Sequence, residues 1–89
     1  MSKQFVDYYD HMTVDEIIEV IMAVYKTKQN RDALMMRYVD GCTYKSILKA
    51  IDKNYPIYEG SAFEMRKTEQ LKRMFRRFER KASEWLNSR

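Results

Sequence analysis

The chain has 89 residues, of which 45% are hydrophobic and 34% are charged, and its formal net charge is +4. This length fits one small domain, residues 1–89, and leaves no room for a second. Because Cys42 is the only cysteine and His11 the only histidine, no internal disulfide can form and a zinc site would lack two of its usual ligands. We therefore expect no metal and no cofactor.

The N-terminal residues lack the apolar core of a signal peptide, and the longest apolar run, residues 20–25, is far too short to span a membrane. We therefore expect a cytoplasmic protein in which Cys42 is a reduced thiol. Two glycines and one proline leave few breakpoints, which favours helices throughout. The predicted fold is an all-α domain of four to five helices, with a helix-turn-helix and a long C-terminal helix.

In chain order, residues 1–12 are predicted to form an arm or short helix that folds back on the domain. Thr13 and Glu16 have the spacing of a capping box, which starts a helix at Val14 that runs to about Lys26. The apolar residues of this helix occupy more than one face. The helix is therefore expected to be central to the core or to be shared with a partner.

Asn30 is predicted to cap a helix from Arg31 to Val39, which Gly41 ends in a left-handed conformation. After a very short connection, Thr43 is predicted to cap the next helix. The buried face of that helix consists of Tyr44, Ile47, Leu48 and Ile51.

Residues 54–60 contain Pro56, which favours a loop. Ser61 and Glu64 then form a second capping box, and no helix breaker follows before the C-terminus. The apolar stripe of this long helix is interpreted as core or as a helix–helix seam, in preference to base stacking by Phe75 or Phe78. The stripe comprises Met65, Thr68, Leu71, Phe75, Phe78, Ala82 and Trp85.

The positive charge is concentrated in the last third of the chain. Residues 61–89 contain nine basic and four acidic residues, a net charge of +5, whereas residues 1–60 have a net charge of −1. A basic helix face is often only a solvated surface. Here the uneven distribution of charge between the two parts of the chain, and the preference for Arg over Lys beyond Arg73, favour contact with phosphates.

Catalysis is not expected. A Cys42–His11 pair has no recognisable nucleophile context, and the sequence contains neither a glycine-rich phosphate loop nor paired catalytic carboxylates. Asp15 and Glu16 are explained as the acidic first turn of a helix, where they complement its dipole.

The stretch from Arg31 to Ile51 resembles the first half of the promoter-reading domain of bacterial sigma factors. It is more similar still to the small sigma-like transcription activators of phages and prophages of Gram-positive bacteria. Those families commonly show an Arg-Tyr-x-x-Gly helix end, a Thr or Ser cap, an aromatic residue and an Ile-containing supporting helix. The corresponding residues here are Arg37, Tyr38, Gly41, Thr43, Tyr44 and Ile47.

The second half, residues 57–67, is similar to the segment that enters the major groove, and the resemblance covers residues 31–78. Two departures affect what it implies. The turn over residues 52–60 is longer than the three to four residues usual for this motif. The region of a sigma factor that melts promoter DNA is missing, so the chain could assist or redirect a sigma factor, or bind DNA independently.

The resemblance and the charge together predict a DNA-binding transcription regulator from a phage or mobile element, which binds double-stranded DNA through a recognition helix that starts near Ser61. The residues expected to read bases are Ser61, Glu64, Arg66, Lys67 and Gln70. Those expected to bind phosphates are Thr43, Lys45, Arg73, Arg76, Arg77, Arg80 and Lys81.

The alternative is a small helical protein-interaction module that binds and inhibits or redirects RNA polymerase, a sigma factor or another nucleic-acid enzyme. The excess of apolar residues in the helix from Val14 to Tyr25, and in Trp85 and Leu86, also predicts a homodimer. The target DNA sequence and the choice between activation and repression do not follow from these patterns.

Overall fold

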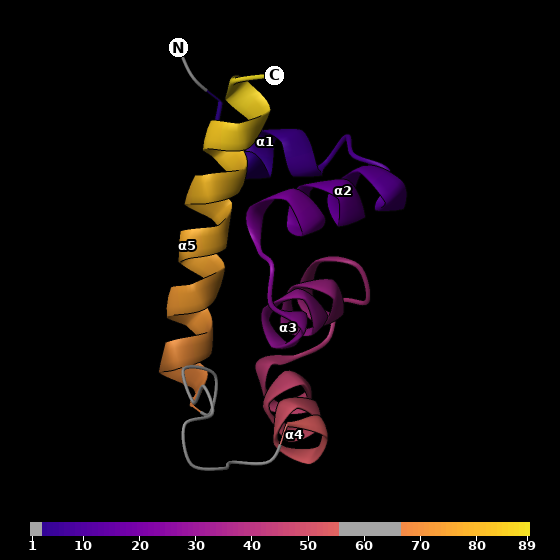
Figure 1. The fold of residues 1–89 in the computed structure, drawn as a ribbon, viewed down its shortest axis with the longest axis vertical. Helices are drawn as coiled ribbons and strands as arrows, with labels where there is room; N and C mark the ends of the chain where they lie inside the picture. The colour runs from indigo at the N-terminus through magenta and orange to yellow at the C-terminus, as the bar shows by residue number, and fades with distance from the viewer. Residues whose placement is uncertain (1–2, 56–66) are drawn as a thin grey trace.

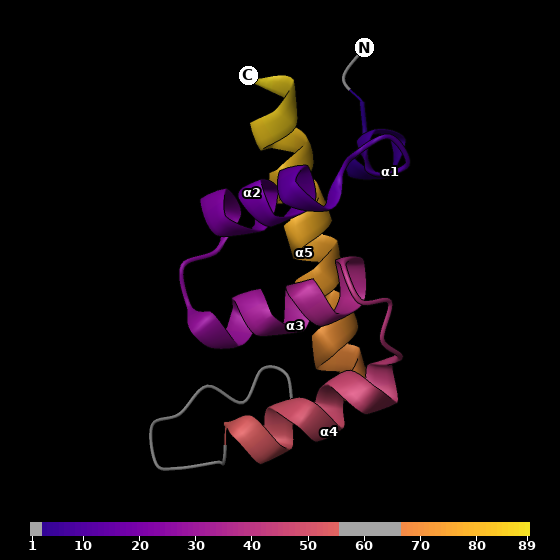
Figure 2. The same ribbon diagram turned by 90° about the vertical axis from the view of Figure 1, so that its right-hand side faces the viewer.

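The computed structural model of the protein describes residues 3–55 and 67–89. These residues form five helices and no strand, which confirms the predicted all-α fold. The long helix α5 (Thr68–Asn87) is the spine of the molecule, and the other four helices lie along one side of it (Figures 1 and 2). Helices α1, α2 and α4 pack on α5, while α3 packs between α2 and α4 and contacts α5 through Tyr38. Among the residues that the structure describes, no helix lies on the opposite side of α5.

The N-terminal residues form the short helix α1 (Phe5–Tyr9), which folds back on α5 as predicted. Phe5 is buried, and its ring meets that of Phe78 edge-on with centroids 5.2 Å apart. The side-chain amide of Asn87 joins the two ends of the chain, because it donates to the Lys3 carbonyl at 2.9 Å and accepts from the Tyr8 hydroxyl at 2.5 Å. The buried ring of Phe5 and the two hydrogen bonds of Asn87 therefore hold the N-terminal segment against α5.

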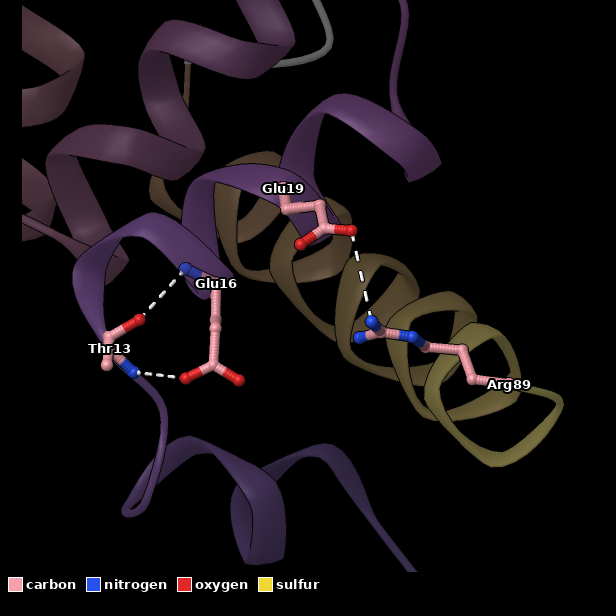
Figure 3. Close-up of polar contacts among 4 residues, drawn as sticks. All are labelled: Thr13, Glu16, Glu19 and Arg89. Carbon is pink, nitrogen blue, oxygen red and sulfur yellow. Dashed lines mark hydrogen bonds and ion pairs between the residues drawn. The ribbon is translucent and has the colours of Figure 1, made fainter.

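Helix α2 (Val14–Val24) begins at the predicted capping box (Figure 3). The Thr13 hydroxyl accepts from the Glu16 N–H at 3.2 Å, and the Thr13 N–H donates to Glu16 Oε1 at 2.9 Å. The bond from the Thr13 N–H to the carboxylate, followed by the interaction with the Thr13 side chain, holds the pKa of Glu16 below its usual value. At the other end, the Arg31 guanidinium donates to the carbonyls of Tyr25 and Met22, which satisfies acceptors that the end of a helix leaves free.

Helix α3 (Lys28–Tyr38) begins earlier than predicted, so the assignment of Asn30 as its cap is wrong. Thr27 is the N-cap residue, and the N–H of Arg31 already donates to the Thr27 carbonyl at 3.0 Å. Asn30 therefore lies in the first turn of the helix. Gly41 ends the segment with φ of +69°, as predicted, and this left-handed conformation suits a residue without Cβ.

Helix α4 (Tyr44–Asn54) is capped by the Thr43 hydroxyl, which accepts from the Ser46 N–H at 3.2 Å. Both this cap and the predicted inner face are confirmed, because Ile47 and Ile51 are fully buried and Tyr44 and Leu48 pack against the core. Beyond the helix, the hydroxyl of Tyr55 donates to the carboxylate of Asp32 on α3. Burial, followed by this hydrogen bond, raises the pKa of Tyr55 to about 12.

The prediction of an unbroken helix from Ser61 to the C-terminus is wrong at Lys67. This residue is extended, with φ of −129° and ψ of 151°, and it is the N-cap residue of α5. Helix propensities of ordinary residues differ by less than about 1 kcal/mol, so the absence of Gly and Pro does not by itself keep a helix continuous. The second capping box, Ser61 with Glu64, lies outside the described residues, as does Met65.

The inner face of α5 supplies a large part of the core. The prediction of a buried stripe is confirmed for Leu71, Phe75, Phe78 and Ala82, whereas Thr68 is exposed and Trp85 is half-buried. Met74 is also buried, although the predicted stripe omitted it. Because Phe75 and Phe78 lie within the core, neither ring is available for base stacking. In residues 3–55 and 67–89, no helix has both the length and the apolar character needed to cross a membrane.

Candidate nucleic-acid interface

Four arginines lie on the side of α5 that faces away from the other helices. All four are exposed, and we call them the arginine face: Arg73, Arg76, Arg77 and Arg80. Arg73 is three and four residues before Arg76 and Arg77, and Arg80 is four and three residues after them, which places all four on one side of the helix, opposite the buried stripe. At 1.5 Å per residue, they span only about 10 Å of helix axis.

The four charges of the arginine face are unpaired in the described part of the chain. Within the part of the chain that the structure describes, none of its four guanidinium groups makes an ion pair, whereas Arg89 pairs with Glu19 on α2 at 3.9 Å (Figure 3). Like charges three or four residues apart on a helix destabilise it by roughly 0.2–0.5 kcal/mol per pair. The arginine face therefore costs the fold some stability, and an external anion would relieve this repulsion.

Gln70 is the one predicted base-reading residue that the structure brings to the arginine face. It lies half-buried in the first turn of α5 and borders a hollow of about 210 Å³ together with Arg73, Met74 and Arg77. An amide and two guanidinium groups thus meet at one opening. Lys67 is exposed at the N-cap of the same helix, while Ser61, Glu64 and Arg66 lie outside the described residues.

The remaining predicted phosphate-binding residues lie elsewhere. Lys81 places its ammonium 5.1 Å from the centre of the Tyr25 ring, on the flank of α5 that faces α2. Thr43 and Lys45 lie at the start of α4, where the Thr43 hydroxyl already accepts from the Ser46 N–H and donates to Ser46 Oγ at 3.0 Å. The Thr43 hydroxyl is therefore committed to the helix cap, and Lys45 is the exposed cation of this pair.

Sequence reasoning missed a second cationic region, which surrounds the ring of Tyr44. The Arg37 guanidinium lies 4.5 Å from the ring centre and the Lys72 ammonium lies 5.4 Å from it. The three residues come from α3, α4 and α5, so no local pattern brings them together. One feature of the sequence could have indicated this region: Arg37 is followed seven positions later, across a short turn, by the aromatic residue Tyr44.

The polar partner of Tyr38 lies at the border between the core and the outer surface of α5. The Tyr38 hydroxyl donates to Glu79 Oε2 at 2.6 Å, although 41 residues separate the two in the sequence. Burial, followed by this hydrogen bond, raises the pKa of Tyr38 well above its usual value. The phenol therefore remains protonated, and it fixes the orientation of the carboxylate.

No protein-family model matches the sequence, and neither a curated protein nor a solved structure matches it. The similarity to sigma-like activators therefore depends on the motif residues alone. Among the residues that the structure describes, no group of three His, Cys, Asp or Glu side chains is placed to hold a metal ion. The chemistry that this surface offers is the binding of anions by guanidinium groups.

Proposed function

We propose that the protein binds double-stranded DNA and regulates transcription, with the arginine face of α5 as its main phosphate-binding surface. The observation that carries this proposal is the set of four exposed, adjacent arginines without an ion pair in the described part of the chain. Guanidinium groups match the geometry of phosphate oxygens and keep their charge at any physiological pH. The sigma-like motif over residues 31–51 adds a phage or mobile-element regulator as the biological context.

The uncovered position of the arginine face supports this proposal. A duplex needs an approach that no other element blocks, and the other four helices lie on the opposite side of α5 (Figures 1 and 2). Phosphate contacts fix the position of a protein on DNA, while side chains beside them read base edges. Gln70, at the hollow that Arg73 and Arg77 border, is the residue we assign to base reading.

The test is duplex binding by the full chain across a salt series. Four arginine–phosphate contacts predict a slope of about −3.6 for the logarithm of the binding constant against that of the salt concentration, at roughly −0.9 per phosphate. Arg73→Ala with Arg77→Ala should flatten the slope by about 1.8 units. Lys49→Ala with Lys53→Ala removes the same charge from exposed positions on α4 and should leave the slope unchanged. Equal slopes for both double variants would reject the arginine face as the binding surface.

A second candidate function is a protein-interaction module that acts on RNA polymerase, a sigma factor or another nucleic-acid enzyme. Exposed apolar side chains on α1 and α2 favour it: Val6 is 57% exposed, Val14 52% and Met22 43%. Absence of duplex binding at low salt, where electrostatic contacts are strongest, would favour this function over DNA binding.

The same exposed side chains on α2 support the homodimer predicted from the sequence, whereas the C-terminal end offers less apolar surface than expected. Trp85 and Leu86 pack against the core, and the Arg89 guanidinium lies 4.7 Å from the centre of the Trp85 ring. We therefore assign the dimer contact to α2. Sedimentation at micromolar concentration tests this, and Met22→Lys should shift a dimer to monomer by placing a charge in the contact. A monomer at every concentration would reject it.

A further inference from the structure

A pocket of about 350 Å³ opens among α1, α3, α4 and α5, on a different side of α5 from the arginine face. Four of its lining residues are aromatic, and two, Arg37 and Glu79, are charged. The lining residues are Tyr9, Arg37, Tyr38, Gly41, Tyr44, Phe75 and Glu79. The functions proposed above do not use this pocket.

Contacts among the aromatic rings hold the walls of the pocket in place. Tyr38 meets Phe75 edge-on at 5.8 Å, and Tyr44 stacks against Phe75 at 6.0 Å with an interplanar angle of 25°. The Tyr9 hydroxyl donates to the Tyr38 carbonyl at 2.6 Å, which ties α1 to the end of α3. A pocket whose walls are already ordered costs little conformational entropy when a ligand enters.

The charges of the pocket are arranged in two positions. Arg37 and Lys72 lie on the ring of Tyr44, and Lys45 is exposed at the next position in the chain. Glu79 supplies the negative charge. Its Oε2 accepts from the Tyr38 hydroxyl at 2.6 Å, and within the described residues Oε1 accepts no hydrogen bond. The site therefore combines aromatic rings, an oriented acceptor and cations around Tyr44.

This combination selects among possible occupants. A lysine or arginine side chain of a partner would be repelled by Arg37 and Lys72. A carboxylate alone could meet the cations but would leave the acceptor of Glu79 unpaired, and a purely apolar group would also leave it unpaired. A nucleobase that carries a phosphate satisfies every group, because the base stacks on the Arg37 guanidinium that the Tyr44 ring supports, its N–H groups donate to the carboxylate, and the phosphate meets the cations.

We propose that this pocket binds a single unstacked nucleobase together with its phosphate, with guanine preferred because its pairing edge presents two adjacent N–H donors to Glu79. The source is either a free nucleotide or an unpaired strand, which share this chemistry. The inference does not rest on duplex binding by the arginine face. The double variant Arg73→Ala with Arg77→Ala should lose duplex affinity and keep nucleotide affinity, so the two proposals can fail separately.

The experiment is a titration of the ¹⁵N-labelled full chain, followed by NMR, with dGMP, deoxyribose 5-phosphate and the pentamer d(TTGTT). We expect dGMP to shift amide signals at Gly41, Tyr44 and Glu79, while deoxyribose 5-phosphate leaves them in place. A pentamer that binds at least tenfold more tightly than dGMP would assign the pocket to a strand. A dGMP affinity equal to or above that of the pentamer would assign it to a free nucleotide.

Two matched pairs of variants locate the contacts. Tyr44→Leu should weaken dGMP binding by about fivefold or more, whereas Tyr44→Phe, which keeps the ring, should stay within about twofold. Glu79→Gln should weaken dGMP binding about tenfold and remove the guanine preference, whereas Glu84→Gln, at an exposed acid on the same helix, should have no effect.

Thermal melting checks that each variant folds. Absence of pocket shifts at millimolar dGMP and pentamer, or equal binding of dGMP and deoxyribose 5-phosphate, would overturn the proposal.

Discussion

The two faces of α5 differ in what they do for the fold, although the same 20 residues form both. The inner face buries Leu71, Phe75 and Phe78 against the other helices, and each buried side chain of this size stabilises the fold by roughly 1.5–3 kcal/mol. The outer face presents four arginines that repel one another and form no ion pair among the described residues. The fold therefore depends on the first face, whereas no ion pair among the described residues ties the arginines of the second face to it.

The largest effect should come from the inner face. Phe78 is fully buried, and its ring contacts those of Phe5, Tyr25 and Tyr38. Phe78→Ala should lower the free energy of unfolding by about 3–5 kcal/mol, because it leaves a cavity among these rings. Urea denaturation measures this, and Phe78→Leu should retain enough stability for comparison if the alanine variant does not fold. A loss below about 1 kcal/mol would show that the inner face is not the centre of the core.

Tyr38 lies between the two faces and should give an intermediate effect. Tyr38→Phe removes the hydrogen bond to Glu79 and should cost about 1.5 kcal/mol, the low end for a bond to a charged group, because the pair is half-buried. The pKa of Tyr38 is raised in the folded state. The contribution of its hydrogen bond to stability is therefore present below the ordinary tyrosine pKa of about 10 and is lost as the pH rises above that value.

The measurement is urea denaturation of both proteins between pH 7 and pH 11. The difference in unfolding free energy between the parent and Tyr38→Phe should shrink above about pH 10. Tyr55→Phe serves as a second alkaline probe, because burial and its bond to Asp32 raise that pKa to about 12. A difference that stays constant up to pH 11 would contradict the role of the Tyr38 proton.

The elements of this fold that the sequence predicted correctly are those that local chemistry specifies. Thr13 with Glu16, Thr43 and Gly41 each act within a few residues of themselves, and the structure confirms all three. The error at Lys67 arose where no strong local signal existed. Asn30 was a valid capping residue, but Thr27 precedes it and Arg31 holds the start of α3 against the end of α2.

The candidate sites divide in the same way. The arginine face was predictable because its members repeat at helical spacing within one element. The pocket around Tyr44 was not predictable, because Tyr9, Arg37, Tyr44 and Glu79 come from different helices. Only the packing of those helices in the folded protein brings these residues together. Three of the predicted base-reading residues lie outside the described part of the chain, so their role stays a prediction.

Substitutions on the outer face should leave the fold almost unchanged. Arg76→Ala with Arg80→Ala removes three of the four like-charged pairs at spacings of three and four residues in the arginine face, and alanine is the best helix former. We therefore expect a change in unfolding free energy within about 0.5 kcal/mol, in the stabilising direction at low salt. Urea denaturation at two salt concentrations tests this, and the gain should fall as salt screens the repulsion. Destabilisation by more than about 1 kcal/mol would mean that these arginines support the fold.

The smallest effect concerns the acid on the outer face. Glu84 is exposed one turn beyond Arg80, and both residues border a shallow hollow near Asn87. If DNA lies along the arginine face, the carboxylate repels phosphates, and Glu84→Gln should strengthen duplex binding by about 1.5- to 2-fold at low salt. The gain should vanish at high salt, because the Debye length falls to about 3 Å at 1 M. Asp10→Asn, at the exposed C-cap residue of α1, removes the same charge from outside α5 and serves as the control. Equal gains from both variants would reflect net charge alone and would place the duplex elsewhere, whereas a gain from Glu84 only would extend the contact toward the C-terminal end of α5.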